Sequence, residues 1–502
     1  MSAPRRPYIE DMVEVLQRAV NRPVLRHEGT DTTGAELLAS TYRYARALNT
    51  LGIDRGDLVA LYAANRPEAL AIRYATHLLG AASVYLSAPP DPDKRAQMLV
   101  DFDPSLVVLF PETTHLLPET TAPVATVGPT QDVYLRLDEL ASVQDPTPLP
   151  CRARLDDFAV LLCSGGTTGV PKGSVRDFAA WTAAVAVHSP PSRRQLANGK
   201  LAYLTQILVD ITLLGGGTVV LQDEFDPAET LAMIEAERIT DLFLVEPQLF
   251  ELMDHPDVPL RDLGSLHALT HIGDAAAPTL RRRARERLGP IIVHTYGASE
   301  VGVVSSLSAA EHDPADPSRF TCAGRIVPDG EVRFRRTDGT LHPTAGSIEV
   351  RSPSMARGYR NRPLEQATNF LDGWYRSGDL GHLDRQGYLH ILGRASDCDE
   401  IGEVVVTPIA LQDTLCRLSQ VRYAAIVFDS DAETRIAAVV PWPDDFIDAA
   451  ACLDAITAEH GPRISTTVQI LTLRKIPLTE QGKPDRPEIL RRARMTRAAV
   501  KE

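Results

Sequence analysis

The sequence of 502 residues lacks several features that define particular protein classes. Its six cysteines are scattered, with no CxxC pair and no cluster of histidines, which argues against a zinc knuckle and against a disulfide framework. Basic residues are fewer than acidic ones, 52 against 66, and the net charge of −14 argues against a nucleic-acid-binding surface as the main function. No tandem repeat or low-complexity tract is present, so a solenoid is not expected.

Long apolar segments are also absent from the sequence. No stretch has about 18 uninterrupted apolar residues, the length that a membrane-spanning helix requires. The first residues, MSAPRRPYIEDMVEV, include two arginines but become acidic before any apolar run develops. We therefore expect a cytoplasmic protein that binds neither a membrane nor nucleic acid.

Roughly the first 300 residues alternate between strand-like and helix-like patterns. Apolar residues recur at helical spacing over residues 36–51, and the strand-like run 58–62 follows. The alternation continues over the segments 67–79, 81–85, 106–110, 218–221, 227–237, 241–245 and 247–253. Such alternation favours parallel sheets flanked by helices, so we predict an α/β fold with a large, doubly wound N-terminal portion.

The pattern changes after Cys322. Short strands are predicted at 331–335, 347–351 and 387–392, which indicates a small β subdomain over about 322–394. A strand and helix pattern resumes after Arg394, with strands expected at 421–428 and 435–440. Because a chain of this length exceeds a single core, we predict an N-terminal core over residues 1–394 and a small α+β C-terminal domain over 395–502.

The segment 161–173, LLCSGGTTGVPKG, is an apolar strand that leads into a loop dense in glycine and hydroxyl groups. Glycines let backbone N–H groups approach phosphate oxygens, hydroxyls add further donors, and Lys172 adds a positive charge. The spacing differs from GxxxxGK[ST], which disfavours a P-loop kinase or GTPase. The composition indicates a phosphate loop, with a flexible surface loop as the alternative.

The segment SGGTTGVPKG resembles the signature phosphate loop of the adenylate-forming superfamily, which includes acyl-CoA synthetases, nonribosomal-peptide adenylation domains and luciferases. Three further segments match in the expected order, and the resemblance spans roughly residues 33–486. It implies activation of a small carboxylic acid as an acyl-AMP anhydride, with ATP and Mg²⁺ as cofactors. The loop residues that it assigns to the nucleotide are Ser164, Gly165, Gly166, Thr167, Thr168, Gly169 and Lys172.

The second matching segment is 294–302, HTYGASEVG, which resembles the family loop that covers the adenine and supplies a carboxylate to the metal. By this resemblance Tyr296 and Gly297 lie at the base, Ser299 reaches the α-phosphate, and Glu300 coordinates Mg²⁺. Mg²⁺ prefers hard oxygen ligands and takes only one or two protein carboxylates when it bridges phosphates. Taken without its flanks, Glu300 would be an ordinary surface glutamate.

Upstream, residues 271–276, HIGDAA, resemble the short stretch that lines the acyl pocket and touches adenine. A plain buried turn is the alternative. The resemblance places Gly273, Asp274 and Ala275 at the nucleotide, and it places Ile272, Gly273 and Ala298 at the acid.

The third segment combines 373–380, GWYRSGDL, with 387–394, GYLHILGR, and resembles the family's ribose site. A carboxylate that accepts both hydroxyl protons suits a vicinal diol, so Asp379 is assigned to the ribose and Arg394 to ribose or phosphate. Without its flanks Asp379 would be a turn aspartate. The family places its interdomain hinge after Arg394, which here is Ser396, and this implies a mobile C-terminal lid.

The fourth segment, 477–486 or PLTEQGKPDR, resembles the C-terminal loop that carries the catalytic lysine, here Lys483. Negative charge accumulates as a carboxylate attacks the α-phosphate and pyrophosphate departs, so a cation brought in by a mobile domain stabilises the transition state selectively. Outside this context, a lysine in a Gly-Pro turn would be solvated.

The loop after the hinge departs from the family pattern. Glu403 stands where a second glycine is expected, and Ala410 replaces the glutamate of a Pro-x-Glu. In CoA-using relatives this loop borders the pantetheine tunnel, so the sequence does not determine the second step. The alternatives are transfer to a thiol of CoA or a carrier protein, transfer to an amine, and nitrite-dependent diazotisation of an aminoaryl acid. A non-catalytic nucleotide-binding relative is a further alternative, although Glu300, Asp379 and Lys483 are intact.

The acid-binding region, 203–218, also departs, because it lacks the aromatic–His pair of many relatives. Asp210 stands in an otherwise apolar run, and a buried carboxylate needs a partner such as a substrate ammonium. An amino or aminoaryl acid would fit this interpretation. The alternatives are that Asp210 caps a helix or meets solvent.

Overall fold

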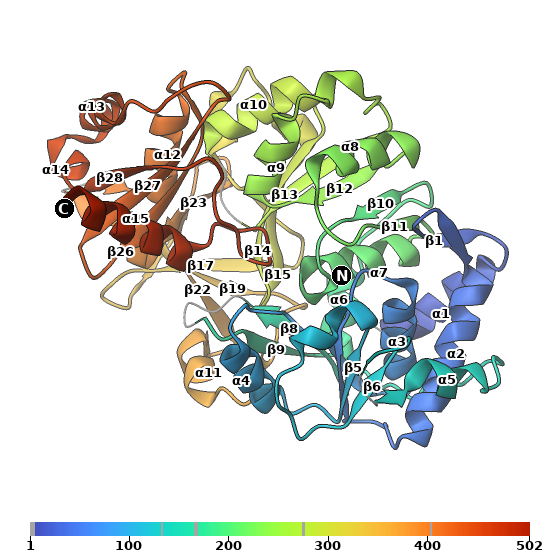
Figure 1. The fold of residues 1–502 in the computed structure, drawn as a ribbon. Coiled ribbons are helices and arrows are strands. Elements are labelled where there is room, and N and C mark those ends of the chain that lie inside the picture. Colours follow the sequence, from blue (N-terminus) through green and yellow to red (C-terminus); the bar gives the residue numbers. More distant parts are fainter. Residues whose placement is uncertain (1–5, 132–133, 165–168, 274–276, 402–403, 502) are drawn as a thin grey trace.

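In the computed structural model the described residues are 6–131, 134–164, 169–273, 277–401 and 404–501. Two large sheets with flanking helices form most of the molecule, and a third sheet and a smaller C-terminal unit follow (Figure 1). No helix of the described part combines the length and the apolar character that crossing a bilayer requires.

The first large sheet has eight strands in the order β20-β9-β8-β4-β3-β5-β6-β7. Every residue of β3 is buried, as expected for an apolar run covered on both faces of a parallel sheet. The strands from β8 to β7 in this order pair in parallel, whereas β8 and β9 form an antiparallel hairpin. The strands are β3 (Leu58–Tyr62), β4 (Ala82–Tyr85), β5 (Leu106–Leu109), β6 (Val124–Thr126), β7 (Leu135–Arg136), β8 (Phe158–Ser164), β9 (Lys172–Asp177) and β20 (Gly358–Tyr359).

The second large sheet has nine strands in the order β16-β15-β14-β13-β12-β10-β11-β1-β2. Its centre is parallel, so the carboxyl ends of β13 and β14 lie at one edge of the sheet. The strands are β1 (Pro23–His27), β2 (Thr30–Thr33), β10 (Arg194–Ala197), β11 (Thr218–Leu221), β12 (Asp241–Leu244), β13 (Ala268–Ile272), β14 (Ile292–Ala298), β15 (Gly302–Leu307) and β16 (Arg325–Ile326).

Helices cover these sheets, and several of the helices start at capping residues or prolines that the sequence shows. Thr33 and Glu36 form a capping box at the start of α2, and Pro67 occupies the first turn of α3. The helices are α1 (Tyr8–Arg18), α2 (Gly34–Thr50), α3 (Pro67–Leu78), α4 (Pro92–Phe102), α5 (Leu137–Ser142), α6 (Phe178–Val185), α7 (Gln206–Leu214), α8 (Pro227–Ala236), α9 (Glu246–Met253) and α10 (Pro278–Leu288), with short helical turns η1 (Pro111–Leu116), η2 (Leu201–Thr205), η3 (Val258–Leu260), η4 (Ala309–Glu311) and η5 (Pro317–Thr321).

The small β subdomain is an antiparallel sheet in the order β18-β17-β19-β22-β21, with β23 also paired to β22. Its short strands follow the turn residues that the sequence shows in this region. The elements are β17 (Glu331–Arg335), β18 (Leu341–His342), β19 (Ala345–Arg351), α11 (Pro363–Asn369), β21 (Phe370–Leu371), β22 (Trp374–Leu383) and β23 (Leu389–Arg394).

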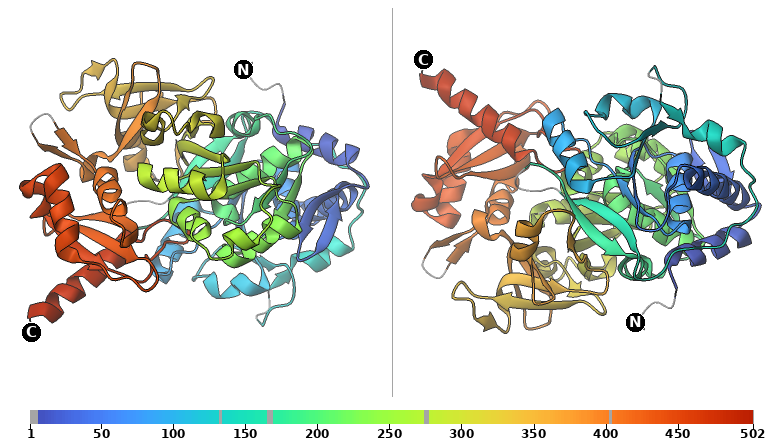
Figure 2. Two further views of the ribbon diagram at one scale, coloured as in Figure 1. Left: turned by 90° about the horizontal axis from the view of Figure 1, so that it is seen from above. Right: turned by 90° about the horizontal axis from the view of Figure 1, so that it is seen from below.

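The C-terminal elements lie at the opposite end of the molecule from helices α1 and α2 (Figure 2). A three-stranded sheet, β26-β27-β28, forms their centre, with β26 antiparallel and β28 parallel to β27. The domain boundary at 394/395 stays a prediction. The elements are η6 (Ala395–Asp397), β24 (Asp399–Ile401), β25 (Val404–Val406), α12 (Pro408–Cys416), β26 (Val421–Asp429), β27 (Thr434–Pro441), α13 (Ala449–His460), α14 (Pro462–Ser465), β28 (Val468–Thr472) and α15 (Arg486–Lys501).

Several contacts join the C-terminal unit to α9. The ring of Tyr423 stacks on Phe250, with 4.0 Å between the ring centroids. Glu246, at the start of α9, accepts hydrogen bonds from the Tyr423 hydroxyl and the Gln412 amide, both at 2.8 Å. These contacts hold the C-terminal unit beside the carboxyl edge of the second sheet.

Asp210 on α7 is fully buried and has protein partners for both carboxylate oxygens. The guanidinium of Arg73 on α3 donates to both oxygens at 2.8 Å, and the Tyr74 hydroxyl and the Trp181 indole N–H donate at 2.8 and 3.0 Å. The prediction that Asp210 pairs with a substrate ammonium is therefore wrong, and so are the helix-cap and solvent alternatives. The reason is that its partner, Arg73, comes from a distant helix.

The buried pair makes a prediction for stability. Asp210→Ala leaves the Arg73 guanidinium buried without a counter-charge, which we expect to lower the free energy of unfolding by about 3–5 kcal/mol in urea denaturation. As a control, Glu331→Ala removes the exposed ion pair with Arg351 and should cost less than about 1 kcal/mol. An Asp210→Ala protein of unchanged stability that binds its acid substrate poorly would restore the substrate interpretation.

Candidate active site

The predicted phosphate loop connects the two strands of the β8–β9 hairpin. Ser164, the last residue of β8, pairs with Lys172, the first residue of β9, so these two residues lie side by side in the hairpin. Gly169 has a φ of +80°, a conformation that glycine adopts without strain. The other predicted loop residues lie outside the described part of the chain: Gly165, Gly166, Thr167 and Thr168.

Lys172 and Glu300 come close to each other around the ring of Tyr359. The Lys172 ammonium lies 4.9 Å from the centre of this ring, and the Tyr359 hydroxyl donates a 2.7 Å hydrogen bond to Glu300 Oε1. Burial, together with the charge of Glu300, raises the pKa of Tyr359, so the phenol keeps the proton that it donates. A cation and a buried carboxylate are thereby fixed next to the phosphate loop.

The loop that carries Ser299 is held by β9. The Ser299 carbonyl accepts hydrogen bonds from Arg176 Nη2 at 2.6 Å and from Ser174 Oγ at 3.2 Å. Burial lowers the pKa of Arg176 to about 10, so the guanidinium still carries its charge at neutral pH. The Ser299 hydroxyl donates to the carbonyl of Cys163, immediately before the phosphate loop, at 3.4 Å.

Three residues predicted at the base and the ribose meet in one cluster. The Tyr296 hydroxyl donates to Asp379 Oδ2 at 2.5 Å, and Arg394 Nε lies 3.3 Å from Asp379 Oδ1. Asp379 and Arg394 also face each other across β22 and β23, and Arg394 donates to the Ser377 carbonyl at 2.5 Å. The small β subdomain thus contributes a carboxylate and a guanidinium to the edge of the second sheet.

Lys483 reaches the same sheet edge from the C-terminal unit. A Cβ atom placed on Gly273 would lie 3.4 Å from Lys483 Cε and 3.9 Å from its Nζ. The lysine loop is closed by two 2.8 Å hydrogen bonds, from the Thr479 N–H to the Lys483 carbonyl and from the Gly482 N–H to the Thr479 carbonyl. The lysine ammonium therefore lies at the carboxyl end of β13.

The residues predicted for the acid come from the ends of neighbouring strands. Ile272 ends β13 and Ala298 ends β14, and these strands pair in parallel. A Cβ atom on Gly297 would lie 2.3 Å from a carbonyl oxygen of β15, so only glycine fits there. Asp274 and Ala275 lie outside the described residues.

A buried histidine pair joins β13 to β14 behind this edge. His271 and His294 stack with 15° between their rings, and their Nδ1 atoms are 2.8 Å apart. Burial, followed by the charge of Arg281, lowers the pKa of His271 to about 3, and it lowers the pKa of His294 as well. Both imidazoles are therefore neutral at neutral pH, and one Nδ1–H donates to the other ring.

The predicted hinge residue, Ser396, lies in η6 directly after β23. Its hydroxyl donates to Asp397 Oδ1 at 2.9 Å, and Asp397 forms an ion pair with Arg486 at the start of α15. Its role as a hinge stays a prediction.

Sequence reasoning missed some residues at the site. Lys94 on α4 lies over the phosphate loop, with its Nζ 2.6 Å from where a Cβ of Gly169 would be. A lysine on a helix gives no signal in the sequence, because solvated helix faces carry many of them. Tyr359 and Arg176 were also missed, because neither stands in a sequence pattern that indicates its buried partners.

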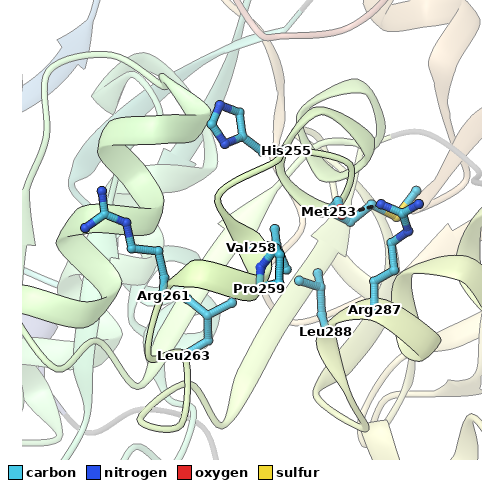
Figure 3. A pocket seen from close by; sticks show the side chains of 8 residues that line it. All are labelled: Met253, His255, Val258, Pro259, Arg261, Leu263, Arg287 and Leu288. Carbon is cyan, nitrogen blue, oxygen red and sulfur yellow. Dashed lines mark hydrogen bonds between the residues drawn. The ribbon is translucent and has the colours of Figure 1, made fainter. Parts of the chain in front are cut away.

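A pocket of about 440 Å³ lies elsewhere on the surface, between the end of α9, η3 and α10 (Figure 3). None of the predicted site residues that the structure describes lines it. Its lining residues are Met253, His255, Val258, Pro259, Arg261, Leu263, Arg287 and Leu288.

Comparison with solved structures finds the same architecture in the amide bond synthetase McbA from Marinactinospora thermotolerans. It is 30% identical, with a TM-score of 0.85 over 97% of this chain and 99% of the synthetase. The anthranilate CoA ligase AuaEII, solved with anthranoyl-AMP, shares the fold with a TM-score of 0.88 over 98% of each chain at 21% identity.

Curated relatives match along nearly the whole chain. The medium/long-chain-fatty-acid–CoA ligase FadD8 of Mycobacterium tuberculosis is 30% identical over 95% of this chain and 88% of its own length. A feruloyl-CoA synthase of Amycolatopsis is 30% identical over 93% of this chain and 95% of its own length. The family model described as "AMP-binding enzyme" matches residues 13–360, and the chain therefore belongs to the family of AMP-binding enzymes.

Proposed function

We propose that the chain uses ATP to activate a small carboxylic acid as an acyl-adenylate, releases pyrophosphate, and transfers the acyl group to a thiol of CoA or a carrier protein. The observation that carries this proposal is the convergence of four separated segments at one place. Lys172, Glu300, the Tyr296–Asp379 pair and Lys483 come from different parts of the sequence and line the edge formed by β13, β14 and the β8–β9 hairpin.

The arrangement suits attack of a carboxylate on the α-phosphorus of ATP. A bond forms between the acid oxygen and phosphorus, and the bond from phosphorus to the pyrophosphate oxygen breaks. Negative charge grows on the phosphate oxygens during this step, and the ammonium of Lys483 would offset it more strongly in the transition state than before. The Asp379 carboxylate would accept hydrogen bonds from the ribose hydroxyls.

Glu300 is the residue that would hold Mg²⁺. Its carboxylate is a hard oxygen donor, it is 5% exposed, and the Tyr359 hydroxyl fixes the position of Oε1. When bound, Mg²⁺ would neutralise negative charge on the phosphates. The neighbouring Lys172 would add a second positive charge at the same phosphates.

The relatives support two different acceptors for the second step. The CoA ligases among the relatives support a thiol, whereas the amide bond synthetase, at the same 30% identity, supports an amine. Glu403 lies outside the described residues. Ala410, in the position of the expected glutamate, lies in the first turn of α12 and donates its N–H to Thr407 Oγ1 at 3.1 Å, so α12 has a complete N-cap without that glutamate.

Removal of the lysine tests the first step. Lys483→Ala should slow pyrophosphate–ATP exchange by roughly 10²–10³-fold, because a transition-state contact is lost, while ATP binding measured by calorimetry changes little. Lys475→Ala, which removes an exposed ammonium of the same unit paired with Glu251, is the matched control and should exchange normally. Near-normal exchange by Lys483→Ala would remove the assignment.

Substitution of the carboxylate tests the metal. Glu300→Gln should raise the Mg²⁺ concentration for half-maximal exchange by roughly ten-fold or more, because a neutral amide is a poorer ligand. Tyr359→Phe keeps the carboxylate and loses only its hydrogen bond, so its shift should be smaller and in the same direction. If both variants titrate with Mg²⁺ like the wild type, the metal is bound elsewhere.

An acceptor screen tests the second step. Pyrophosphate release is measured over a panel of aryl, fatty and amino acids, with and without hydroxylamine, and the responsive acid is then given CoA, a carrier protein, an amine or nitrite. We expect thioester formation. Amide formation without thioester would favour the amine alternative, a diazotised product would favour nitrite chemistry, and no pyrophosphate exchange with any acid would indicate a non-catalytic relative.

A further inference from the structure

Glu480 connects the lysine loop to two separate segments of the N-terminal portion. It stands three residues before Lys483, and its Oε2 accepts a 2.6 Å hydrogen bond from the Ala88 N–H and a 3.1 Å hydrogen bond from the Tyr203 hydroxyl. Ala88 follows β4 of the first sheet, whereas Tyr203 lies in η2, before α7. A single carboxylate of the C-terminal unit thus bridges both segments.

The surroundings of this carboxylate favour its hydrogen bonds. Glu480 keeps exposed surface, yet the protein atoms around the carboxyl group desolvate it enough to raise its pKa, against the lowering effects of its two donors and of Lys200. Burial, followed by the charge of Glu480, raises the pKa of Tyr203, so the phenol is protonated and donates. Lys200 is itself paired with Glu224 at 3.0 Å and does not form an ion pair with Glu480 among the described contacts.

The position of Glu480 is transmitted to Lys483 through a tight turn. The two 2.8 Å backbone hydrogen bonds that close residues 479–483 leave little freedom between the two side chains. Gly482, inside this turn, has a φ of +79°, and a Cβ there would lie 2.8 Å from Val245 Cγ2. The turn is therefore packed against the N-terminal portion, and its backbone hydrogen bonds couple the position of Glu480 to that of Lys483.

The segments that receive Glu480 also lie near the phosphate loop. The chain from Ala88 leads into α4, whose Lys94 lies over Gly169. The phenol of Tyr203 is close enough to Ser87 and Cys163 to interact with both, and Cys163 belongs to the strand that precedes the loop. Docking of Glu480 therefore depends on the same elements that place the phosphate loop.

We infer that Glu480 is a positioning residue, which docks on the Ala88 N–H and the Tyr203 hydroxyl and thereby holds Lys483 in the arrangement for adenylation. This inference rests on the proposed function of Lys483. Glu480 does not contact the reacting atoms itself. It sets how much of the enzyme has the lysine in place during the first step.

The docking contact is tested without any substrate. Hydrogen exchange followed by mass spectrometry should show faster exchange at Ala88 in Glu480→Ala than in the wild type, and labelling of Lys483 by acetic anhydride should increase. Asp454→Ala, which removes an exposed carboxylate on α13 of the same unit, is the matched control and should change neither readout. Unchanged exchange at Ala88 would show that the contact does not form in solution.

The role in catalysis is tested by pyrophosphate–ATP exchange with the acid that gives most pyrophosphate in the panel. Glu480→Ala should lower kcat by roughly 10- to 100-fold, since two hydrogen bonds to a carboxylate are lost, with the KM for ATP within about two-fold of the wild type. Glu480→Gln should keep most of the rate, because the desolvated site tolerates a neutral acceptor that still accepts from the Ala88 N–H.

A double-mutant cycle separates positioning from a general loss of structure. If Glu480 acts through Tyr203, Glu480→Ala should cost clearly less in the Tyr203→Phe background than in the wild type. Additive losses, or a Glu480→Ala enzyme with normal kcat in spite of faster exchange at Ala88, would overturn the positioning role. A wild-type enzyme without exchange activity on any acid would instead refute the proposed function. The hydrogen-exchange measurement at Ala88 would then still test the Glu480 contact by itself.

Discussion

A buried guanidinium holds the candidate active site together. Arg176 on β9 donates to the carbonyl of Ser299 at 2.6 Å, to the carbonyl of Ser354 at 2.7 Å and to Ser174 Oγ at 3.2 Å. The first contact fixes the loop that carries Glu300, and the second fixes the segment that leads to Tyr359. Because carbonyls inside a protein need donors, these loops take their positions from one side chain on the hairpin of the phosphate loop.

The regular elements could largely be predicted from the sequence, since strong local patterns determine them. The continuous apolar run 58–62 is β3, and the alternating run 331–335 is β17, because these patterns and their flanking turn residues favour strands. The antiparallel pairing of β8 with β9 was not predicted, because a glycine-rich loop after a strand gives no indication of whether a strand or a helix follows.

The residues of the candidate site differ in how far the sequence could indicate them. Tyr296, Asp379 and Lys483 were predicted from resemblance to a family, which gives positions that local physics does not, and the structure brings them to one sheet edge. Asp210 was misread because the sequence shows its apolar neighbours and not Arg73, its partner in space. Lys94 and Glu480 could not be found at all, since charged residues on a helix or in a turn look like solvated ones until the tertiary contacts are known.

The contact between Glu246 and the C-terminal unit opposes any rearrangement that separates this unit from α9. Any arrangement that takes α12 and β26 away from α9 would break the hydrogen bonds of Glu246 with Tyr423 and Gln412 and expose the Glu246 carboxylate to water. It would also separate the Phe250 and Tyr423 rings. Once water replaces the lost partner, the net cost of each broken hydrogen bond is about 0.5–1.5 kcal/mol. An acceptor that required such a rearrangement would have to replace these contacts with new ones of similar strength.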